Sequence, residues 1–154
     1  MMQTVVYEGK GNLAIKEKQL PVLEKGEALI RVSHVGICGT DILVWHGGLE
    51  RVQPPVVLGH EFSGVIEKIS DDQYSFQEGD RVVAEPLITC QSCLACRTGF
   101  YNVCTSLKLI GVDTDGGMAK YVKVPVNKLF KLKPTTSMQE AAFVEPLAVG
   151  VHMV

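Results

Sequence analysis

A histidine and a carboxylate stand side by side between two glycines in the segment GHEFSG at residues 59–64. Cys38 lies upstream in the segment GICGTD, and Glu145 lies far downstream before a proline. Zinc accepts nitrogen, sulfur and oxygen ligands in tetrahedral geometry, and a catalytic site keeps one position for water or substrate. A lone Gly-His-Glu is weak, because most single histidines are structural or surface groups. The set of Cys38, His60, Glu61 and Glu145 nevertheless fits a catalytic zinc site.

The densest group of ligand side chains is a run with the spacing C-x2-C-x2-C-x7-C: Cys90, Cys93, Cys96 and Cys104. Four thiolates can surround one zinc at Zn–S distances of about 2.3 Å and leave no open position, which is typical of a structural site. Structural zinc in small peptides contributes on the order of 10 to 16 kcal/mol, enough to order a segment with few apolar residues.

Two other interpretations of the four cysteines are a pair of disulfides or inert thiols, and an iron–sulfur cluster. Disulfides suit a reducing compartment poorly. The triplet C-x2-C-x2-C also occurs in ferredoxins, but the second cysteine group of two-cluster ferredoxins is missing from this sequence. We therefore expect zinc.

Size and composition predict one globular domain, because 154 residues with 46% hydrophobic residues can bury a sizeable core but not two ordinary ones. The net charge is -2 and the lysines are scattered, so the sequence has no basic stripe. This argues against binding to nucleic acid or to an anionic membrane surface. Arg97 is the one basic residue among the four cysteines, too little for phosphate contacts. With no signal peptide or membrane-spanning run expected, we predict a cytoplasmic protein.

The elements that must position these ligands are short strands separated by glycine and proline. Residues 4–7 and 13–18 predict an opening hairpin around the glycine-containing turn at 8–12. Residues 27–35 alternate between apolar and polar positions and predict a strand that leads into Cys38. The apolar face of that strand would carry Ala28, Ile30 and Val32.

A short helix is expected at residues 41–46, with Thr40 or Asp41 as its cap and Gly47-Gly48 at its end, so that Cys38 lies at a strand-to-helix junction. Further strands are expected at four places: residues 62–69, 81–84, 119–124 and 128–132. Many short strands with turn signals between them predict a β-barrel-like body.

The C-terminal part changes to a helical pattern. Ser137 and Glu140 form the Ser-x-x-Glu pattern of a capping box, which predicts a helix from about residue 138. Pro146 disfavours helical dihedrals at Glu145 and suits the first position of a second helix over residues 146–154. Glu145 would then sit at a junction. Because the second helix would only be beginning at residue 154, we expect a truncation there rather than a domain boundary.

Six motifs in order resemble the zinc-containing medium-chain alcohol and polyol dehydrogenases, in particular the N-terminal catalytic domain of sorbitol and threonine dehydrogenase-like members. The motifs are GICGTD at 36–41, GHEFSG at 59–64, GDRV at 79–82, the four-cysteine run, DGGMAKYV at 115–122 and EPLA at 145–148. The resemblance implies a mainly β fold: a GroES-like, partly open β-barrel with short helices and a zinc lobe at about residues 88–106. Residues 1–154 would form this domain, without the Rossmann cofactor domain of the family.

The resemblance also implies roles for individual residues. Cys38 and His60 would hold the catalytic zinc, with Glu61, Glu145 or a water completing its shell, and Thr40 would relay the substrate proton. The structural zinc would be held by Cys90, Cys93, Cys96 and Cys104. Leu43 stands where many members carry a relay histidine, so no relay beyond Thr40 is predicted.

The implied activity is hydride transfer from an alcohol or polyol to NAD or NADP. Zinc lowers the pKa of bound water from about 15.7 to roughly 7 and should similarly favour an alkoxide, which gives up hydride readily. No convincing dinucleotide fingerprint is present, so the isolated chain is expected to be inactive, and the full-length protein to be a homo-oligomer with a small-molecule substrate. The alternative, a non-enzymatic zinc-binding GroES-like assembly or interaction module, leaves the Cys38, His60 and Glu145 set unexplained.

Overall fold

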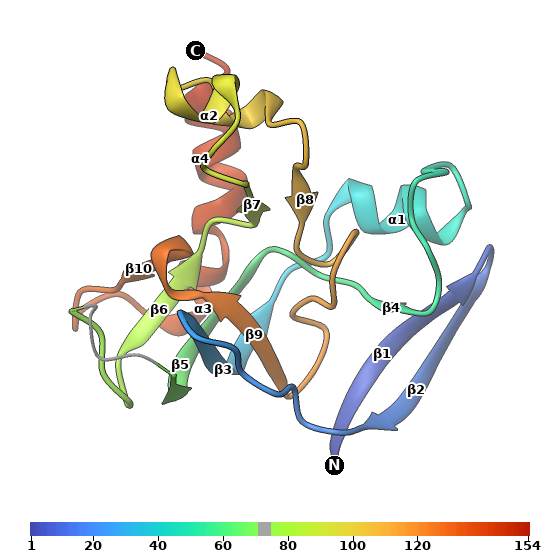
Figure 1. Cartoon of the computed structure of the whole chain (residues 1–154). Coiled ribbons are helices and arrows are strands. Elements are labelled where there is room, and N and C mark those ends of the chain that lie inside the picture. Colours follow the sequence, from blue (N-terminus) through green and yellow to red (C-terminus); the bar gives the residue numbers. More distant parts are fainter. Residues whose placement is uncertain (71–74) are drawn as a thin grey trace.

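The computed structural model of the chain describes residues 1–70 and 75–154 (Figure 1). Its body is a five-stranded sheet in the order β10-β6-β5-β3-β9, in which every pairing is antiparallel. The five strands are β3 (Glu27–Val35), β5 (Phe62–Ile69), β6 (Arg81–Ala84), β9 (Tyr121–Pro125) and β10 (Leu129–Lys131). The first three have the predicted bounds. The last two are shifted and shortened, because a 3-10 turn, η2 (Val126–Lys128), separates them.

A second sheet has the order β2-β1-β4 and contains β1 (Met2–Gly9), β2 (Asn12–Lys18) and β4 (Val56–Val57). The predicted opening hairpin of β1 and β2 is confirmed. The two-residue strand β4 was not predicted, since it is too short to show any alternation. A bridge between Thr4 and Ala119 joins β1 to the segment that precedes β9. The two sheets together form the mainly β, partly open arrangement that the sequence predicts.

The core consists of two clusters of buried apolar side chains. The larger cluster is formed mainly by side chains of the five-stranded sheet. It contains Ala28, Ile30, Phe62, Ile66, Val82, Ala84, Ile110, Val122, Val124, Val126 and Leu129. Ala28 and Ile30 are fully buried, and Val32 packs against this cluster, as the alternation predicts. The smaller cluster lies beneath β1, β4 and the first helix, and contains Tyr7, Val44, Val52, Val56, Leu58 and Val112. The segment that carries His60 runs from the smaller cluster into the larger one.

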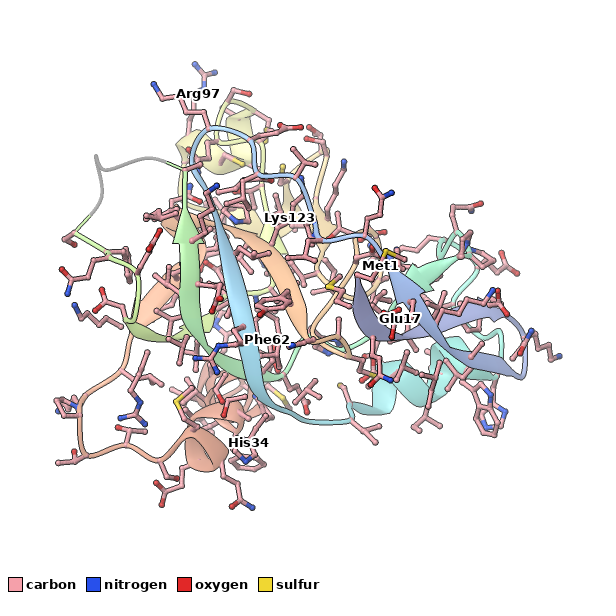
Figure 2. The ribbon with its side chains drawn as sticks, turned by 90° about the horizontal axis from the view of Figure 1, so that it is seen from below. Met1, Glu17, His34, Phe62, Arg97 and Lys123 are labelled. Atoms are coloured by element: carbon pink, nitrogen blue, oxygen red, sulfur yellow. The ribbon has the colours of Figure 1, made fainter. Side chains whose placement is uncertain are left out.

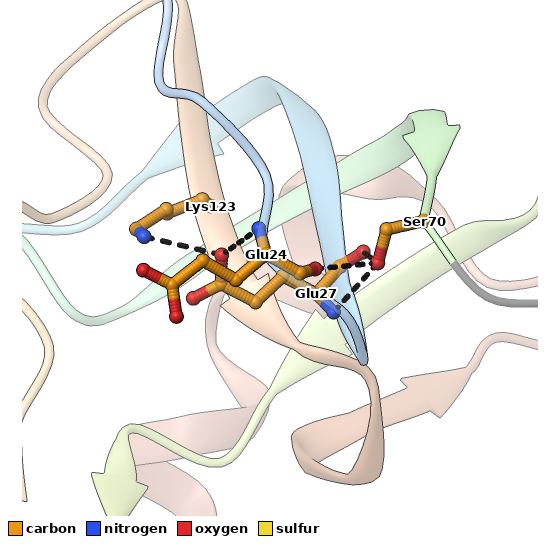
Figure 3. A network of polar contacts seen from close by, with 4 residues as sticks. All are labelled: Glu24, Glu27, Ser70 and Lys123. Atoms are coloured by element: carbon orange, nitrogen blue, oxygen red, sulfur yellow. Dashed lines mark hydrogen bonds and ion pairs between the residues drawn. The ribbon is translucent and has the colours of Figure 1, made fainter.

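A polar network joins the end of β5 to the start of β3 (Figure 3). The Ser70 hydroxyl lies 2.6 Å from the carbonyl oxygen of Glu24 and accepts a hydrogen bond from the N–H of Glu27 at 3.0 Å. The carboxylate of Glu27 in turn accepts from the N–H of Glu24 at 2.8 Å and from Lys123 at 3.1 Å. This network fixes the pairing of β3 with β5 and β9 at the end of the sheet away from Cys38.

Helix α1 (Gly39–Trp45) follows β3 directly, so Cys38 lies at the predicted strand-to-helix junction. The N-cap residue is Cys38 itself, which corrects the expectation of Thr40 or Asp41: Asp41 is the third helical residue, and its carboxylate accepts a hydrogen bond from the Cys38 N–H at 2.8 Å. Gly47 has a φ of 72° and ends the helix, with its N–H bonded to the carbonyl of Val44 at 2.8 Å.

Helices α3 (Met138–Ala142) and α4 (Val144–His152) form the C-terminal part. The predicted capping box of Ser137 and Glu140 is present. The expectation that Glu145 is non-helical is wrong, because α4 begins at Val144 and includes it. Pro146 is tolerated inside the first turn because an N–H at that position has no partner within the helix. None of the helices in the described part of the chain is long and apolar enough to cross a membrane.

The four cysteines form a lobe at one end of the molecule, together with α2 (Leu94–Arg97) and the 3-10 helix η1 (Tyr101–Val103). The lobe is joined to the body by the paired strands β7 (Leu87–Ile88) and β8 (Lys108–Leu109). Figure 1 shows the lobe at the same end of the molecule as the C-terminus. Figure 2 shows Arg97 on the outer edge of the lobe, pointing away from the ribbon.

Candidate metal centres

The structure brings Cys38, His60 and Glu61 together, with one ligand atom of each within 4.8 Å of the others. Cys38 is held at the start of α1, whereas His60 and Glu61 lie in the short link between β4 and β5. The strand pairing explains the approach, since Val35 faces Phe62 at the ends of β3 and β5. Residues just beyond this pair, on both strands, therefore meet. A soft sulfur, a ring nitrogen and a carboxylate oxygen at this separation are a suitable donor set for zinc.

His60 has an unusual environment for a structural histidine. Its side chain is only 5% exposed, yet Nδ1 has no hydrogen-bond partner among the residues that the structure describes. Oδ1 of Asp41 lies 3.9 Å from Nδ1, too far for a direct hydrogen bond. A buried imidazole nitrogen without a partner costs free energy. This orphaned group, next to a thiol and a carboxylate, supports a metal site better than a packing role.

Asp41 connects the two segments that carry the candidate ligands. Its buried carboxylate accepts the N–H of Cys38 at 2.8 Å through Oδ2 and the N–H of Gly59 at 3.3 Å through Oδ1. The same oxygen faces the His60 ring. Asp41 thus orients the candidate ligands through their backbone, by holding the N–H groups of Cys38 and Gly59. The sequence predicts only a helix-capping role for Asp41, and its place three residues after Cys38 is the spacing of a capping box.

Glycines let the backbone before His60 pack without side chains. Gly59 has a φ of 92°, and a Cβ on Gly116 would lie 2.2 Å from the carbonyl oxygen of Gly59. The segment after Asp115 also bonds to this backbone, with the N–H of Gly117 donating to Gly59 at 2.7 Å and that of Met118 donating to Leu58 at 2.9 Å. The DGG motif thus supports the His60 segment directly.

Glu145 approaches the same site from α4, although its carboxylate lies outside the compact group of three. Burial raises the pKa of the Glu145 carboxyl, while the nearby His60 lowers it and Glu61 raises it further. These influences place Glu145 within electrostatic reach of both residues. Thr40, the predicted proton-relay residue, is partly buried in the first turn of α1, two residues from Cys38.

The second group consists of the four cysteine sulfurs of the lobe, all within 4.8 Å of one another. The Sγ–Sγ distances are 3.4 Å for Cys93 and Cys96, 3.5 Å for Cys90 and Cys104, and 4.0 Å for Cys90 and Cys96. A tetrahedral zinc with Zn–S bonds of about 2.3 Å needs sulfurs roughly 3.8 Å apart. All five cysteines of the chain are free thiols. The lobe therefore matches a tetrahedral cation site and not a pair of disulfides.

Backbone groups of the lobe already point at its sulfurs. The N–H of Cys93 donates to Cys90 Sγ at 3.3 Å, and the N–H of Cys90 donates to Cys104 Sγ at 3.4 Å. Hydrogen bonds from the side chain and backbone of Ser92, and then from Cys93, lower the pKa of the Cys90 thiol to about 5. Desolvation, and next the Cys93 side chain, raise the pKa of Cys96 to about 12. The pKa values of Cys90 and Cys96 are thus shifted in opposite directions. A bound cation would lower the pKa of every thiol in the lobe, because it favours the thiolate form.

Lys128 links the lobe to the body through an ion pair within the body and an aromatic contact with the lobe. Lys128, the last residue of η2, bonds to the Glu85 carboxylate at 2.9 Å, and its ammonium lies 5.6 Å from the centre of the Tyr101 ring. Tyr101 belongs to η1 of the lobe. The ammonium thus attracts both a carboxylate of the body and an aromatic ring of the lobe.

The fold and these two groups of ligands define the class of protein. The sequence pattern of the alcohol dehydrogenase GroES-like domain matches residues 24–134, and the chain belongs to this family. This confirms the predicted GroES-like fold and the predicted family.

Individual relatives agree with the family assignment. L-galactonate-5-dehydrogenase of Escherichia coli strain K12 is 36% identical over 153 residues, which cover 99% of this chain and 45% of that protein. A candidate zinc-binding dehydrogenase from Sinorhizobium meliloti 1021, solved with NADP bound, has a TM-score of 0.93 at 37% identity and covers 99% of this chain and 44% of its own. A thermostable alcohol dehydrogenase from Pyrobaculum aerophilum, with cobalt and zinc bound, has a TM-score of 0.85 at 30% identity over 94% of this chain and 44% of its own. The chain thus spans slightly less than half of the relatives it matches.

Proposed function

We propose that this chain is the catalytic-domain portion of a zinc-dependent oxidoreductase that transfers hydride from an alcohol or polyol to NAD or NADP. The observation that carries the proposal is the meeting of Cys38, His60 and Glu61 within 4.8 Å, around a buried imidazole whose Nδ1 has no described partner. A packing role would leave that nitrogen unsatisfied at a cost. Dehydrogenase relatives with NADP or with cobalt and zinc bound support the same interpretation.

Each residue then has a defined task. Cys38 and His60 would hold the catalytic zinc, and Glu61, Glu145 or a water would complete its shell. Cys90, Cys93, Cys96 and Cys104 would hold the structural zinc. When bound, the catalytic zinc supplies the charge that acidifies an alcohol hydroxyl, and a nicotinamide held elsewhere accepts the hydride. Thr40, beside Cys38, would take the hydroxyl proton. Reduced thiols are needed at both sites, so a reducing compartment such as the cytoplasm is proposed.

Residues 1–154 would form the catalytic domain alone, because the relatives extend well beyond the matched region. The dinucleotide site would then lie in a further domain, the isolated chain would not turn over substrate, and the whole enzyme would be a homo-oligomer. The nature of the alcohol or polyol and the choice between NAD and NADP would be set partly by that domain.

The experiment that tests the proposal is elemental analysis of zinc in the purified chain and in two variants, Cys38→Ser and Cys93→Ser. We expect two zinc ions per chain and the loss of one in each variant. A single zinc that survives Cys38→Ser and is lost in Cys93→Ser would contradict the catalytic assignment.

A second measurement examines whether the Cys38 site has an exchangeable position. With Co²⁺ in this site, addition of a small alcohol should alter the visible absorption, because this absorption depends on the ligands of the ion. A closed site would give no change, which would favour a purely structural metal.

A further inference from the structure

Gly36 lies directly opposite Glu61, just beyond the last pair of the β3–β5 ladder, Val35 with Phe62. The N–H of Gly36 donates to the carbonyl oxygen of Glu61 at 2.7 Å, which continues the ladder by one step. Side chains at opposed positions of antiparallel strands normally stand with their Cβ atoms about 4.5 to 5.5 Å apart. Here the Glu61 side chain occupies the space that a side chain on Gly36 would fill.

The contact is specific to the carboxylate. A Cβ built on Gly36 would lie 2.4 Å from Oε2 of Glu61, 3.2 Å from its Cβ and 3.5 Å from its Cδ. Gly36 does not have a positive φ, so its backbone conformation does not require glycine. Glycine at this position therefore serves to leave space. The atom that lies closest to a Cβ there is Oε2 of Glu61, a carboxylate oxygen of a candidate metal ligand.

We propose that Gly36 is a positioning residue of the Cys38 site: the space above its Cα lets the Glu61 carboxylate lie beside the Cys38 thiol and the His60 imidazole, and so keeps this oxygen ligand available to the metal. This inference rests on the proposed function. It adds a residue that binds nothing itself and acts through Glu61 alone.

The test compares Gly36→Ala with Gly39→Ala, a matched control in the same motif, where an added Cβ would meet no atom within 4 Å. The chain is prepared with zinc in the cysteine lobe, and Co²⁺ is titrated into the second site. We expect Gly36→Ala to weaken Co²⁺ binding about 10- to 100-fold and to change its visible spectrum, as loss of an orienting contact does at other metal sites. Gly39→Ala should leave both unchanged.

Glu61→Ala in a double-mutant cycle separates positioning from general damage. If Gly36 acts through the carboxylate, Gly36→Ala will cause little further loss of Co²⁺ affinity in the Glu61→Ala background, so the two effects will not add. Additive effects, or a Gly36→Ala variant with the parent's affinity and spectrum, would overturn the inference while leaving the proposed function intact. A parent chain that binds no Co²⁺ beyond the lobe would overturn both.

Discussion

At the scale of single residues, the Cys38 site depends on side chains that bind no metal. Asp41 is 3% exposed and accepts two backbone N–H groups, one from each segment that carries candidate ligands. Asp41 therefore holds the segment of Cys38 close to the segment of His60. Asparagine has the same shape but only one acceptor oxygen, so one of the two N–H groups would face its NH2 group, and the charge that strengthens both hydrogen bonds would be lost.

Replacing Asp41 with asparagine should therefore weaken metal binding at the Cys38 site by roughly 10- to 100-fold, with the lobe unaffected. Competition with a chelator measures both affinities. Asp113→Asn is the control, since Asp113 also accepts a backbone N–H, from Leu109 at 2.8 Å, but has no contact with a candidate ligand of the Cys38 site. Equal affinity in the Asp41 variant and the parent would contradict the assigned role.

At the scale of elements, close backbone packing holds the link between β4 and β5. Gly116 has no room for a methyl group, because its Cβ would lie 2.2 Å from one carbonyl oxygen and 2.7 Å from the next. Both oxygens belong to the backbone, of Gly59 and Leu58, so no side chain can move aside. The position of His60 therefore depends on a turn 56 residues further along the chain.

We expect Gly116→Ala to destabilise the chain by about 1 to 3 kcal/mol or more and to reduce metal binding at the Cys38 site. Gly150→Ala is the contrasting variant: Gly150 lies in α4 with no atom near an added Cβ, and alanine should be neutral or stabilising by about 0.5 to 1 kcal/mol. Urea unfolding of the three proteins gives the comparison. Equal stability of Gly116→Ala and the parent would mean that this contact is not tight in solution.

The capping box of α3 is a second element with a measurable contribution. Ser137→Ala removes the hydroxyl that accepts the N–H of Glu140 at 3.1 Å and should lower the free energy of unfolding by about 1 kcal/mol. The measurement is urea unfolding at neutral pH.

The pH dependence of this box has a predictable sign. Hydrogen bonds from the side chain and then the backbone of Ser137 lower the pKa of Glu140 below its ordinary value of 4.5. A lowered folded-state pKa stabilises the fold above pH 4.5, and this stabilisation is lost as the pH falls through the folded pKa. Glu140→Gln should abolish this part of the acid sensitivity; an unchanged pH profile of stability would contradict it.

At the scale of the whole molecule, the cysteine lobe and the barrel have different sources of order. The barrel contains both apolar clusters, whereas Cys104 is the one buried residue of the described segment 90–104. The lobe therefore depends for its order on the four sulfurs and on the contact of Lys128 with Tyr101.

Removing metal with a chelator should unfold the lobe and leave the barrel folded. Amide hydrogen exchange measures this directly: the N–H groups of Arg97 and Phe100, which are bonded within the lobe at 3.0 Å and 2.8 Å, should lose protection, while those of β3 and β5 keep it. Cys104→Ser should give the same pattern without a chelator. Protection that persists at Arg97 after complete metal removal would show that the lobe packs without an ion.

The sequence by itself determined the identities of the candidate ligands and most of the elements that carry them. Cys38, His60 and the four lobe cysteines were readable from their types and spacing, and the strands Glu27–Val35 and Phe62–Ile69 were readable from local alternation and flanking turns. These are local signals, and local signals survive folding when they agree with the core.

Only the tertiary structure decided which distant residues meet. The register of β3 on β5 sets Gly36 against Glu61, and the packing of Gly116 on Gly59 fixes the backbone before His60. Asp41 holds both ligand segments, and Glu145 is helical because the first turn of α4 needs no N–H from Pro146. Most of these contacts join residues far apart in the chain, and the short β4, which pairs with β1, depends on such a contact too. Their free energies arise only after the sheets have formed, so no local pattern encodes them.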